Sequence, residues 1–327
     1  MRKLTYRDSI REAIRQSMKI DESVFVYGQG VDDAQGVFGT SLDLVKEFGN
    51  DRVFDVPVSE NALTGIGVGA SLLGMRPIMV NQRIDFTLLA MDQIANHAAK
   101  LHYMWGGHVK VPFVIRNIVG RGWGQGSQHS QCFHSIFSHF PGLKVIVPSN
   151  AYDAKGLLIE AIRDNNPVIT VEHKFLLDSE DVVPEEMYNI PFGRGRVVKE
   201  GTDVTVVAFS QMVIETIKAV EKLAEMGIDI EIIDPRTAYP LDEDLIGNSV
   251  KKTGRLVIAD IDWINCGITA EVSARISENY FTFLKAPIKR IGLPHANHPS
   301  SYALEKIFFP DEDDIVETVK IIMKSTN

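Results

Sequence analysis

The sequence predicts an α/β protein with two doubly wound domains, in which parallel strands are covered by helices on both faces. Up to about residue 172, short apolar runs alternate with helical patterns, which is typical of a parallel sheet wrapped by helices. This periodicity fails over 173–199, and a second alternating series starts at residue 204. We therefore expect a first domain over 1–185, a linker over 186–200 and a smaller domain over 201–327.

The first domain is expected to begin with a helix. Thr5 stands at a candidate N-cap, and apolar residues recur at helical spacing from Ile10 to Met18. Six apolar runs are then expected to form strands, over 24–28, 53–58, 77–81, 112–116, 143–149 and 167–172. Helices are expected over 41–48, 62–73, 87–101 and 151–163, the last after the candidate caps Ser149 and Asn150.

The second domain repeats the same alternation at smaller size. Its strands are expected over 204–210, 228–233, 255–260 and 288–291. Its helices are expected over 212–226, 243–252 and 270–277.

Composition narrows the class of protein. The net charge of -9 and the lack of a cationic run argue against a nucleic-acid partner. The two cysteines, Cys132 and Cys266, have no disulfide or zinc spacing. No segment approaches the roughly 20 apolar residues of a membrane span, and the N-terminus lacks the apolar run of a signal peptide. A cytoplasmic protein that contacts no membrane is therefore expected.

The first candidate site is FDVPVSENALTGIGVGASLLG at 54–74, a strand, a turn and a small-residue helix. The turn presents Glu60, which is either a solvated turn residue or an acid placed for chemistry. Gly65, Gly67 and Gly69 resemble a dinucleotide fingerprint, but their spacing is imperfect. Close packing of the helix against a neighbour explains these glycines better than a nicotinamide cofactor does.

The second candidate is NIVGRGWGQGSQHSQ at 117–131, a glycine-rich loop directly after a strand. Open α/β sheets build their sites at this edge, so His129 is a candidate proton carrier. A surface or hydrogen-bonded structural role is the alternative. His134 and His139 follow in an apolar helical pattern and are expected to be structural. A triad with Ser130 lacks the GxSxG elbow that would place a nucleophile.

The third candidate is AIRDNNPV at 161–168, where a helix ends before a proline. Its polar side chains either satisfy the last backbone groups of the helix or surround a hard cation. The residues alone favour the former.

Several segments together resemble one family. VPVSENALTGIGVGASLLGMRPI, AMDQIANHAAKLHYMWGG, RGWGQGSQHSQCFHSIFSHFPGLKVIVPSN, AIRDNNPV, GTDVTVVAFSQM, IDPRTAYPLD and VKKTGRLVIAD occur in this order. They resemble the β subunit of the E1 component of 2-oxoacid dehydrogenase complexes, which act on pyruvate, branched-chain 2-oxo acids or acetoin. The likeness covers nearly the whole chain.

The resemblance implies a transketolase-like pyrimidine-binding domain, a smaller transketolase C-terminal domain and thiamine diphosphate as cofactor. Glu60 matches the carboxylate that hydrogen-bonds N1′ of the aminopyrimidine, and Phe86 matches the aromatic residue that stacks on it. His129 matches a histidine beside the substrate channel that serves proton transfer. Potassium is implied near the positions that match Phe113, Ala161, Ile162, Asp164 and Asn166, which reverses the preference stated above for AIRDNNPV.

The chain has no GDG motif, the part of thiamine enzymes that anchors the diphosphate through Mg²⁺. The resemblance therefore implies that a separate E1 α subunit supplies this site, in an α2β2 heterotetramer with a β–β contact. Oxidative decarboxylation of a 2-oxo acid would end in acyl transfer to lipoyl-E2.

Two departures from the family concern the substrate and the acceptor. Arg83 stands in QRIDF, where many relatives have QFADF, and either binds a polar substrate group or pairs with Asp85. DIDWINCG and GLPHANHPSS also differ from common relatives. The alternatives to the dehydrogenase are a split transketolase-like C–C ligase that uses an aldehyde acceptor, and a non-catalytic structural subunit.

Overall fold

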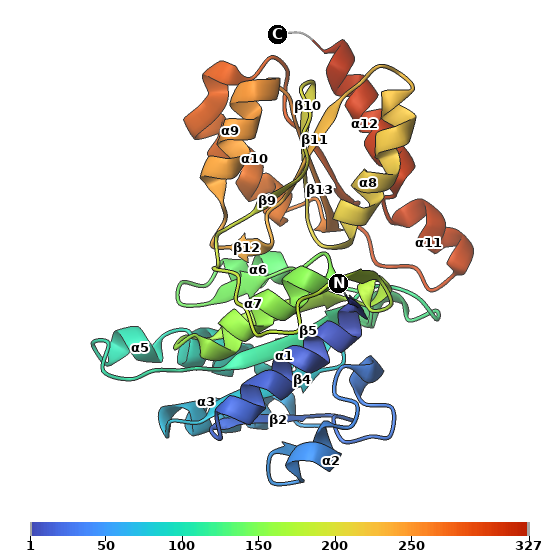
Figure 1. Ribbon diagram of the computed structural model, residues 1–327. Coiled ribbons are helices and arrows are strands. Elements are labelled where there is room, and N and C mark those ends of the chain that lie inside the picture. Colours follow the sequence, from blue (N-terminus) through green and yellow to red (C-terminus); the bar gives the residue numbers. More distant parts are fainter. Residues whose placement is uncertain (1, 326–327) are drawn as a thin grey trace. The chain divides into compact units, whose positions relative to one another are not determined.

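The computed structural model describes residues 2–325 and separates the chain into two compact units (Figure 1). The first unit comprises Met1–Gly120 and Ile136–Phe192. The second comprises Arg121–Ser135 and Gly193–Asn327. The expected boundaries at 185 and 200 stay a prediction. The sequence did not indicate that the glycine loop groups with the second unit.

The first unit is built on a parallel sheet. Its strands lie in the order β6-β7-β5-β4-β2-β3, all parallel, and β1 and β8 form a separate antiparallel pair. The strands are β1 (Lys3–Thr5), β2 (Val24–Gly28), β3 (Val53–Phe54), β4 (Arg76–Asn81), β5 (Val114–Val119), β6 (Lys144–Ile146), β7 (Val168–His173) and β8 (Glu180–Val182). The strand expected over 53–58 is only two residues long, since Pro57 cannot donate to a ladder and restricts the residue before it.

Most helices of the first unit were expected. They are α1 (Tyr6–Ile20), α2 (Leu44–Phe48), α3 (Glu60–Leu72), α4 (Ile84–Thr87), α5 (Leu101–Met104) and α7 (Ala151–Arg163), and α6 (His134–Ser138) crosses the division between the units. Thr5 caps α1 and Asn150 caps α7, because each side chain accepts a backbone N–H at 3.2 and 2.9 Å. The region expected to form one helix over 87–101 is helical but is not a single α-helix: a 3₁₀ turn, Leu88–Ala90, and a π-helical stretch, Asp92–Ala98, lie between α4 and α5.

The second unit is also doubly wound. Its strands lie in the order β14-β13-β10-β11-β9, parallel except for β9. They are β9 (Arg196–Lys199), β10 (Val204–Ala208), β11 (Ile230–Asp234), β13 (Leu256–Trp263) and β14 (Lys289–Leu293), and β12 (Thr237–Tyr239) lies outside this sheet. The helices are α8 (Gln211–Ala224), α9 (Glu243–Thr253), α10 (Ile268–Tyr280), α11 (Tyr302–Phe308) and α12 (Glu312–Lys324). Helices α9 and α10 cover one face, and α8 and α12 the other (Figure 1). The predicted fold class is confirmed.

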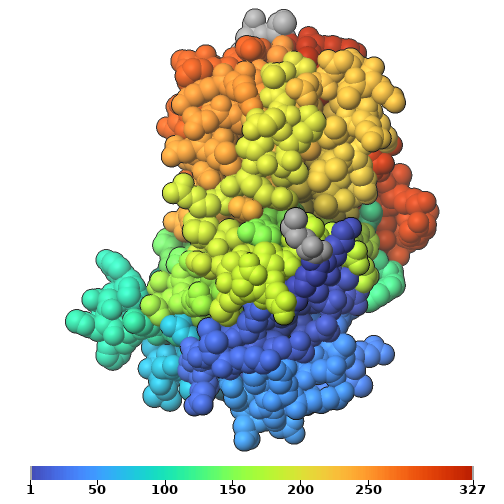
Figure 2. Space-filling view, in the orientation of Figure 1, coloured from blue at the N-terminus to red at the C-terminus, as the bar shows by residue number. Residues whose placement is uncertain are grey.

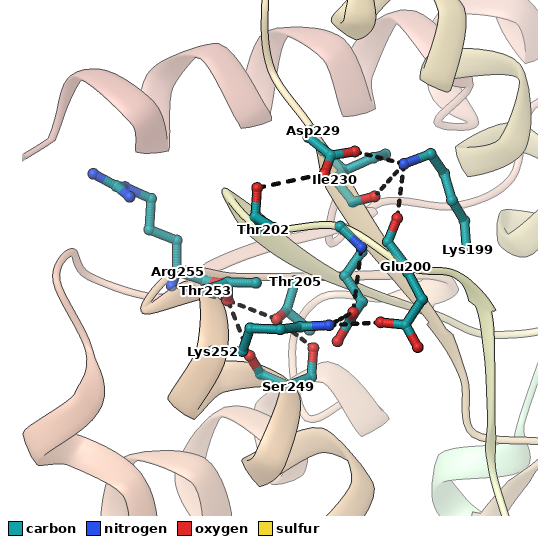
Figure 3. A network of polar contacts seen from close by, with 12 residues as sticks. Lys199, Glu200, Thr202, Thr205, Asp229, Ile230, Ser249, Lys252, Thr253 and Arg255 are labelled. Carbon is teal, nitrogen blue, oxygen red and sulfur yellow. Dashed lines mark hydrogen bonds and ion pairs between the residues drawn. The ribbon is translucent and has the colours of Figure 1, made fainter.

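A polar network ties the helical layer of the second unit to its sheet (Figure 3). Thr205 of β10 is buried, and its hydroxyl bonds to those of Ser249 and Thr253 on α9 at 2.6 and 2.7 Å. Lys252 of the same helix pairs with Glu200 at 2.6 Å, in the turn before β10. These bonds satisfy a hydroxyl that would otherwise be buried without a partner, and they set the register of α9 against β10.

Helix α3 lies close to the sheet because it carries Gly67. A Cβ at this position would come within 2.3 Å of the Tyr27 hydroxyl and 2.5 Å of the Phe113 ring. The packing explanation is confirmed for Gly67, whereas nothing lies within 4 Å of a Cβ on Gly69. Among residues 2–325, no helix combines the length and the apolar character that a bilayer crossing requires.

Candidate functional site

One edge of the first sheet gathers three candidate segments. Strands β3, β2, β4 and β5 are consecutive parallel neighbours, so their carboxyl ends meet at the same edge. Glu60 follows β3, Arg83 and Phe86 follow β4, and Gly120 follows β5. Sites in open α/β sheets lie in this position.

Glu60 is a buried acid for which the described residues show no side-chain partner. It opens α3, and its side chain is 7% exposed. Within residues 2–325, no hydrogen bond or ion pair engages the carboxyl group; only the backbone carbonyl is used, by the Thr64 hydroxyl at 2.8 Å. The positive end of the helix dipole favours an acid here. An acid that is almost buried and whose carboxyl group no bond within the described residues engages, at the edge where open α/β sheets bind ligands, is a candidate ligand-binding residue.

Arg83 is held by the protein itself. Its side chain is 4% exposed, its Nη1 donates to the carbonyl oxygen of Gly120 at 2.9 Å, and its guanidinium lies 5.9 Å from the ring centre of Phe38. Burial lowers its pKa, and the charge of Asp85 opposes that shift. The guanidinium therefore fastens the start of the glycine loop. Phe86 is half-buried in the short helix α4.

A buried amide and hydroxyl cluster beneath this edge was missed by sequence reasoning. Asn81 donates to Thr87 at 3.0 Å and to Asn117 at 3.1 Å, and Thr87 also donates to Asn117 at 2.5 Å. The cluster joins the ends of β4 and β5 to α4, which carries Phe86. The available signal was a polar residue near the end of each apolar strand.

A buried ion pair in the same sheet was also missed. Arg116 of β5 donates from Nε and Nη2 to the two carboxylate oxygens of Glu172 on β7, at 2.8 and 2.7 Å. Both side chains are at most 2% exposed. A charged residue inside each of two apolar strands was the signal that pointed to a pair.

The predicted proton carrier, His129, belongs to the second unit and is half-buried. The loop around it is held from both sides. On one side, Arg121 donates to the Glu305 carbonyl at 2.6 Å and Ser127 donates to the His298 carbonyl at 3.0 Å. On the other side, the loop continues into α6. Since Glu60 lies in the first unit, the two predicted proton-transfer residues belong to different units.

His134, at the start of α6, belongs to a buried charged cluster with Asp260 and Asp262 of β13. His134 Nε2 lies 2.8 Å from Asp260 Oδ2, and the Ser135 hydroxyl donates to Asp262 Oδ2 at 2.7 Å. Burial by itself lowers the pKa of His134, but the two carboxylates outweigh it and raise the pKa to about 9. Burial raises the pKa of Asp262 to about 6. One ligand atom from each of His134, Asp260 and Asp262 lies close enough to the others to hold a metal ion. A protonated imidazole, however, already compensates the negative charge of the carboxylates. The structural role expected for His134 is consistent with this pairing.

The segment predicted to hold potassium already contacts two cations of the chain. Arg76 Nη1 donates to the carbonyls of Ile162 and Asp164, each at 2.9 Å. Lys144 pairs with the Asp164 carboxylate, and the Phe113 carbonyl accepts the Val168 N–H at 2.9 Å. The two other predicted ligands, Ala161 in the last turn of α7 and Asn166 just after it, complete the segment.

The fold and two domain matches define a class of protein, the two-domain module of transketolase type. Residues 2–179 match the transketolase pyrimidine binding domain, and residues 193–315 match the transketolase C-terminal domain. A solved structure described as a split gene transketolase, inactive β4 tetramer, aligns with a TM-score of 0.81 over 99% of both chains. At 22% identity, this likeness shows the fold alone.

Curated relatives narrow the class. The β subunit of acetoin:2,6-dichlorophenolindophenol oxidoreductase from Cupriavidus necator is 43% identical, with 99% of this chain and 98% of the relative covered. The β subunit of the pyruvate dehydrogenase E1 component from Rickettsia felis is 41% identical, with 97% of each covered. The chain belongs to the family of pyruvate and acetoin dehydrogenase E1 β subunits.

Proposed function

We propose that the chain is the catalytic β subunit of a thiamine-diphosphate-dependent 2-oxoacid dehydrogenase E1, an oxidoreductase that passes an acyl group to a lipoyl disulfide. The observation that carries the proposal is the buried carboxyl group of Glu60, unpaired within residues 2–325, in a pyrimidine-binding domain. Identity of about two residues in five with E1 β subunits supports the same activity.

The residues present fit the aminopyrimidine part of the cofactor. Glu60 would hold a proton between its carboxyl group and the ring nitrogen N1′, and Phe86 would pack against the ring. Bound thiamine diphosphate supplies the electron sink for the loss of CO₂. His129 would carry a proton on the substrate side.

The diphosphate and Mg²⁺ would be held by another chain, because no GDG motif occurs in this sequence. We assign this role to an E1 α subunit in an α2β2 assembly with a β–β contact. Two apolar surfaces of the first unit support such contacts. Tyr103, Met104 and Trp105 are 86%, 68% and 60% exposed in and after α5, which projects from its unit in turquoise in Figure 2. Ile66 on α3 and Leu73, the residue directly after this helix, are 60% and 87% exposed.

Arg83 is proposed to influence substrate preference indirectly, through the glycine loop, and not by contacting the substrate itself. Its guanidinium is bonded to the Gly120 carbonyl, so it would act by setting the start of the glycine loop. Arg83→Phe should then alter the preference among 2-oxo acids through the loop, and unchanged preference would remove Arg83 from the specificity argument.

The activity is tested by co-expressing the chain with an α chain that carries the GDG motif. The purified pair would be offered pyruvate, branched-chain 2-oxo acids and acetoin, with dichlorophenolindophenol, a lipoyl domain and aldehydes as separate acceptors. We expect dye reduction and acyl-lipoyl product that depend on one 2-oxo acid. A hydroxyketone formed only with aldehydes would indicate the C–C ligase. A cofactor-loaded pair that turns over no substrate would contradict the proposal.

Potassium is expected to stabilise the complex of this chain with its α chain against thermal unfolding. A carbonyl oxygen has two lone pairs, so those of Ile162 and Asp164 can bond to Arg76 and still face a cation. Ligand at a hundred times its Kd stabilises by about 2.7 kcal/mol, which corresponds to a rise in Tm of several degrees. Thermal unfolding would be compared in KCl and choline chloride at equal ionic strength. Equal Tm values would show that Arg76 and Lys144 replace the ion.

A further inference from the structure

The loop that carries His129 is rich in glycine, so its backbone is restricted little by its own side chains. Gly122, Gly124 and Gly126 have φ values of +119°, +70° and +62°, a region that favours glycine. A Cβ on Gly126 would lie 2.2 Å from the Ser300 hydroxyl, so the loop is fitted closely against that segment. Because glycine adds little stiffness, the contacts that the chain makes before and after His129 contribute to its position.

The anchor before His129 is a set of bonds to the C-terminal segment of the same unit. The guanidinium of Arg121 bonds to the Glu305 carbonyl and lies 4.5 Å from the ring centre of Phe309. Ser127 bonds to the carbonyl of His298, whose ring lies 5.0 Å from that of Trp263. This anchor is made of neutral acceptors and an aromatic ring.

The contacts after His129 are made by a buried cluster of charged side chains. His134 and Ser135 bond to Asp260 and Asp262 of β13, so both carboxylates face the start of α6. The other oxygen of each carboxylate accepts a backbone N–H of β13 at 2.8 Å. Both carboxylates are thus fixed to the sheet, and the imidazole bonds to a rigid partner.

The charge balance makes His134 indispensable to this anchor. Asp260 and Asp262, both from β13, act on His134 through their charges, and the ring centre of Phe209, the residue after β10, lies 6.4 Å from that of His134. Without the imidazolium, two carboxylates would remain buried side by side. Breaking a buried pair by removing one partner is costly because the other charge is left without compensation.

We propose that His134 is a positioning residue for His129: paired with Asp260 and Asp262, it fixes the glycine loop to β13 and thereby sets where the His129 imidazole lies. This inference rests on the proton-transfer role proposed for His129. It assigns a function in the reaction to a histidine that would otherwise count as part of the core.

The experiment compares His134→Gln with the double variant His134→Gln/Asp260→Asn in the assembled α/β enzyme. The control is His139→Gln, which changes an exposed histidine in the segment that follows α6. Hydrogen–deuterium exchange of peptides covering 121–131 and of those covering β4 and β5 would be measured, together with kcat and KM. Exchange reports on the loop even if no 2-oxo acid is turned over, so failure of this inference is distinguishable from failure of the proposed function.

In His134→Gln we expect exchange over 121–131 to rise about tenfold while β4 and β5 stay protected. We expect kcat to fall roughly 10- to 100-fold from misplacement of His129, with KM changed less than about twofold. The double variant should recover part of both losses, since an amide pair replaces the unbalanced charge. Unchanged loop exchange, or a loss equal in both variants, would overturn the proposal.

Discussion

Replacing Glu60 by glutamine is expected to lower kcat of the assembled enzyme by about 10²- to 10⁴-fold, the contribution of a positioned proton-transfer group. Glutamine keeps the size of the side chain and can still hydrogen-bond, but it cannot exchange a proton. The carboxyl group makes no bond to the protein within residues 2–325, so the substitution removes no contact that stabilises the fold. Steady-state turnover of the preferred 2-oxo acid and calorimetric binding of thiamine diphosphate would be measured on the same preparation.

The matched control for this variant is Asn61→Gln, the exposed next residue of the same helix. It alters the first turn of α3 without altering an acid, and its kcat should stay within about twofold of the parent, as expected for an exposed substitution. If Glu60→Gln bound the cofactor and kept full activity, Glu60 would not be the proton donor. The chain would then be better described as a structural subunit.

The second large effect is on stability. Arg116→Met removes the guanidinium that pairs with Glu172 and leaves that carboxylate, 2% exposed, inside the sheet. Breaking a buried pair in this way costs about 3–5 kcal/mol. The free energy of unfolding of the first unit would be followed by denaturant titration, with hydrogen exchange of β5 and β7 as the local probe.

The double variant Arg116→Met/Glu172→Leu separates the effect of an unpaired buried charge from the effect of changing the side chains at these two positions. Two apolar residues of similar volume leave no buried charge, so most of the lost stability should return. Thr170, which donates to Glu172 at 2.9 Å, then loses one bond and accounts for a residual loss of about 1 kcal/mol. Equal losses in the single and double variants would mean that shape, rather than charge, holds β5 against β7.

Local sequence signals predicted the elements that local bonds define. Helices α1 and α7 begin where Thr5 and Asn150 indicate, because a cap is decided by three or four consecutive residues. The region 87–101 was expected to form one helix and is interrupted by a π-helical stretch. Helical spacing alone does not tell an α-helix from a π-helix, since packing against neighbouring helices such as α3 also affects which register fits.

The site was predicted in part. Glu60 was singled out as an acid on a turn and Phe86 by the family resemblance, and the sheet order places them after β3 and β4, the two strands on either side of β2. Their proposed roles stay predictions. Arg83 was considered as a substrate ligand or a partner of Asp85, and its bond to the Gly120 carbonyl was not foreseen. That bond joins segments 37 residues apart, and no spacing rule connects them.

The sequence by itself determined the two α/β domains, the family and the positions of the candidate acid and histidine, because periodicity, caps and motifs are read from neighbouring residues. Only the tertiary structure decided which charges share a buried space. The pairs Arg116–Glu172 and His134–Asp260 join residues 56 and 126 positions apart. Tertiary structure also decided that the glycine loop groups with the second unit. Such contacts depend on which strands become neighbours, and strand order is set by burying the whole apolar surface together.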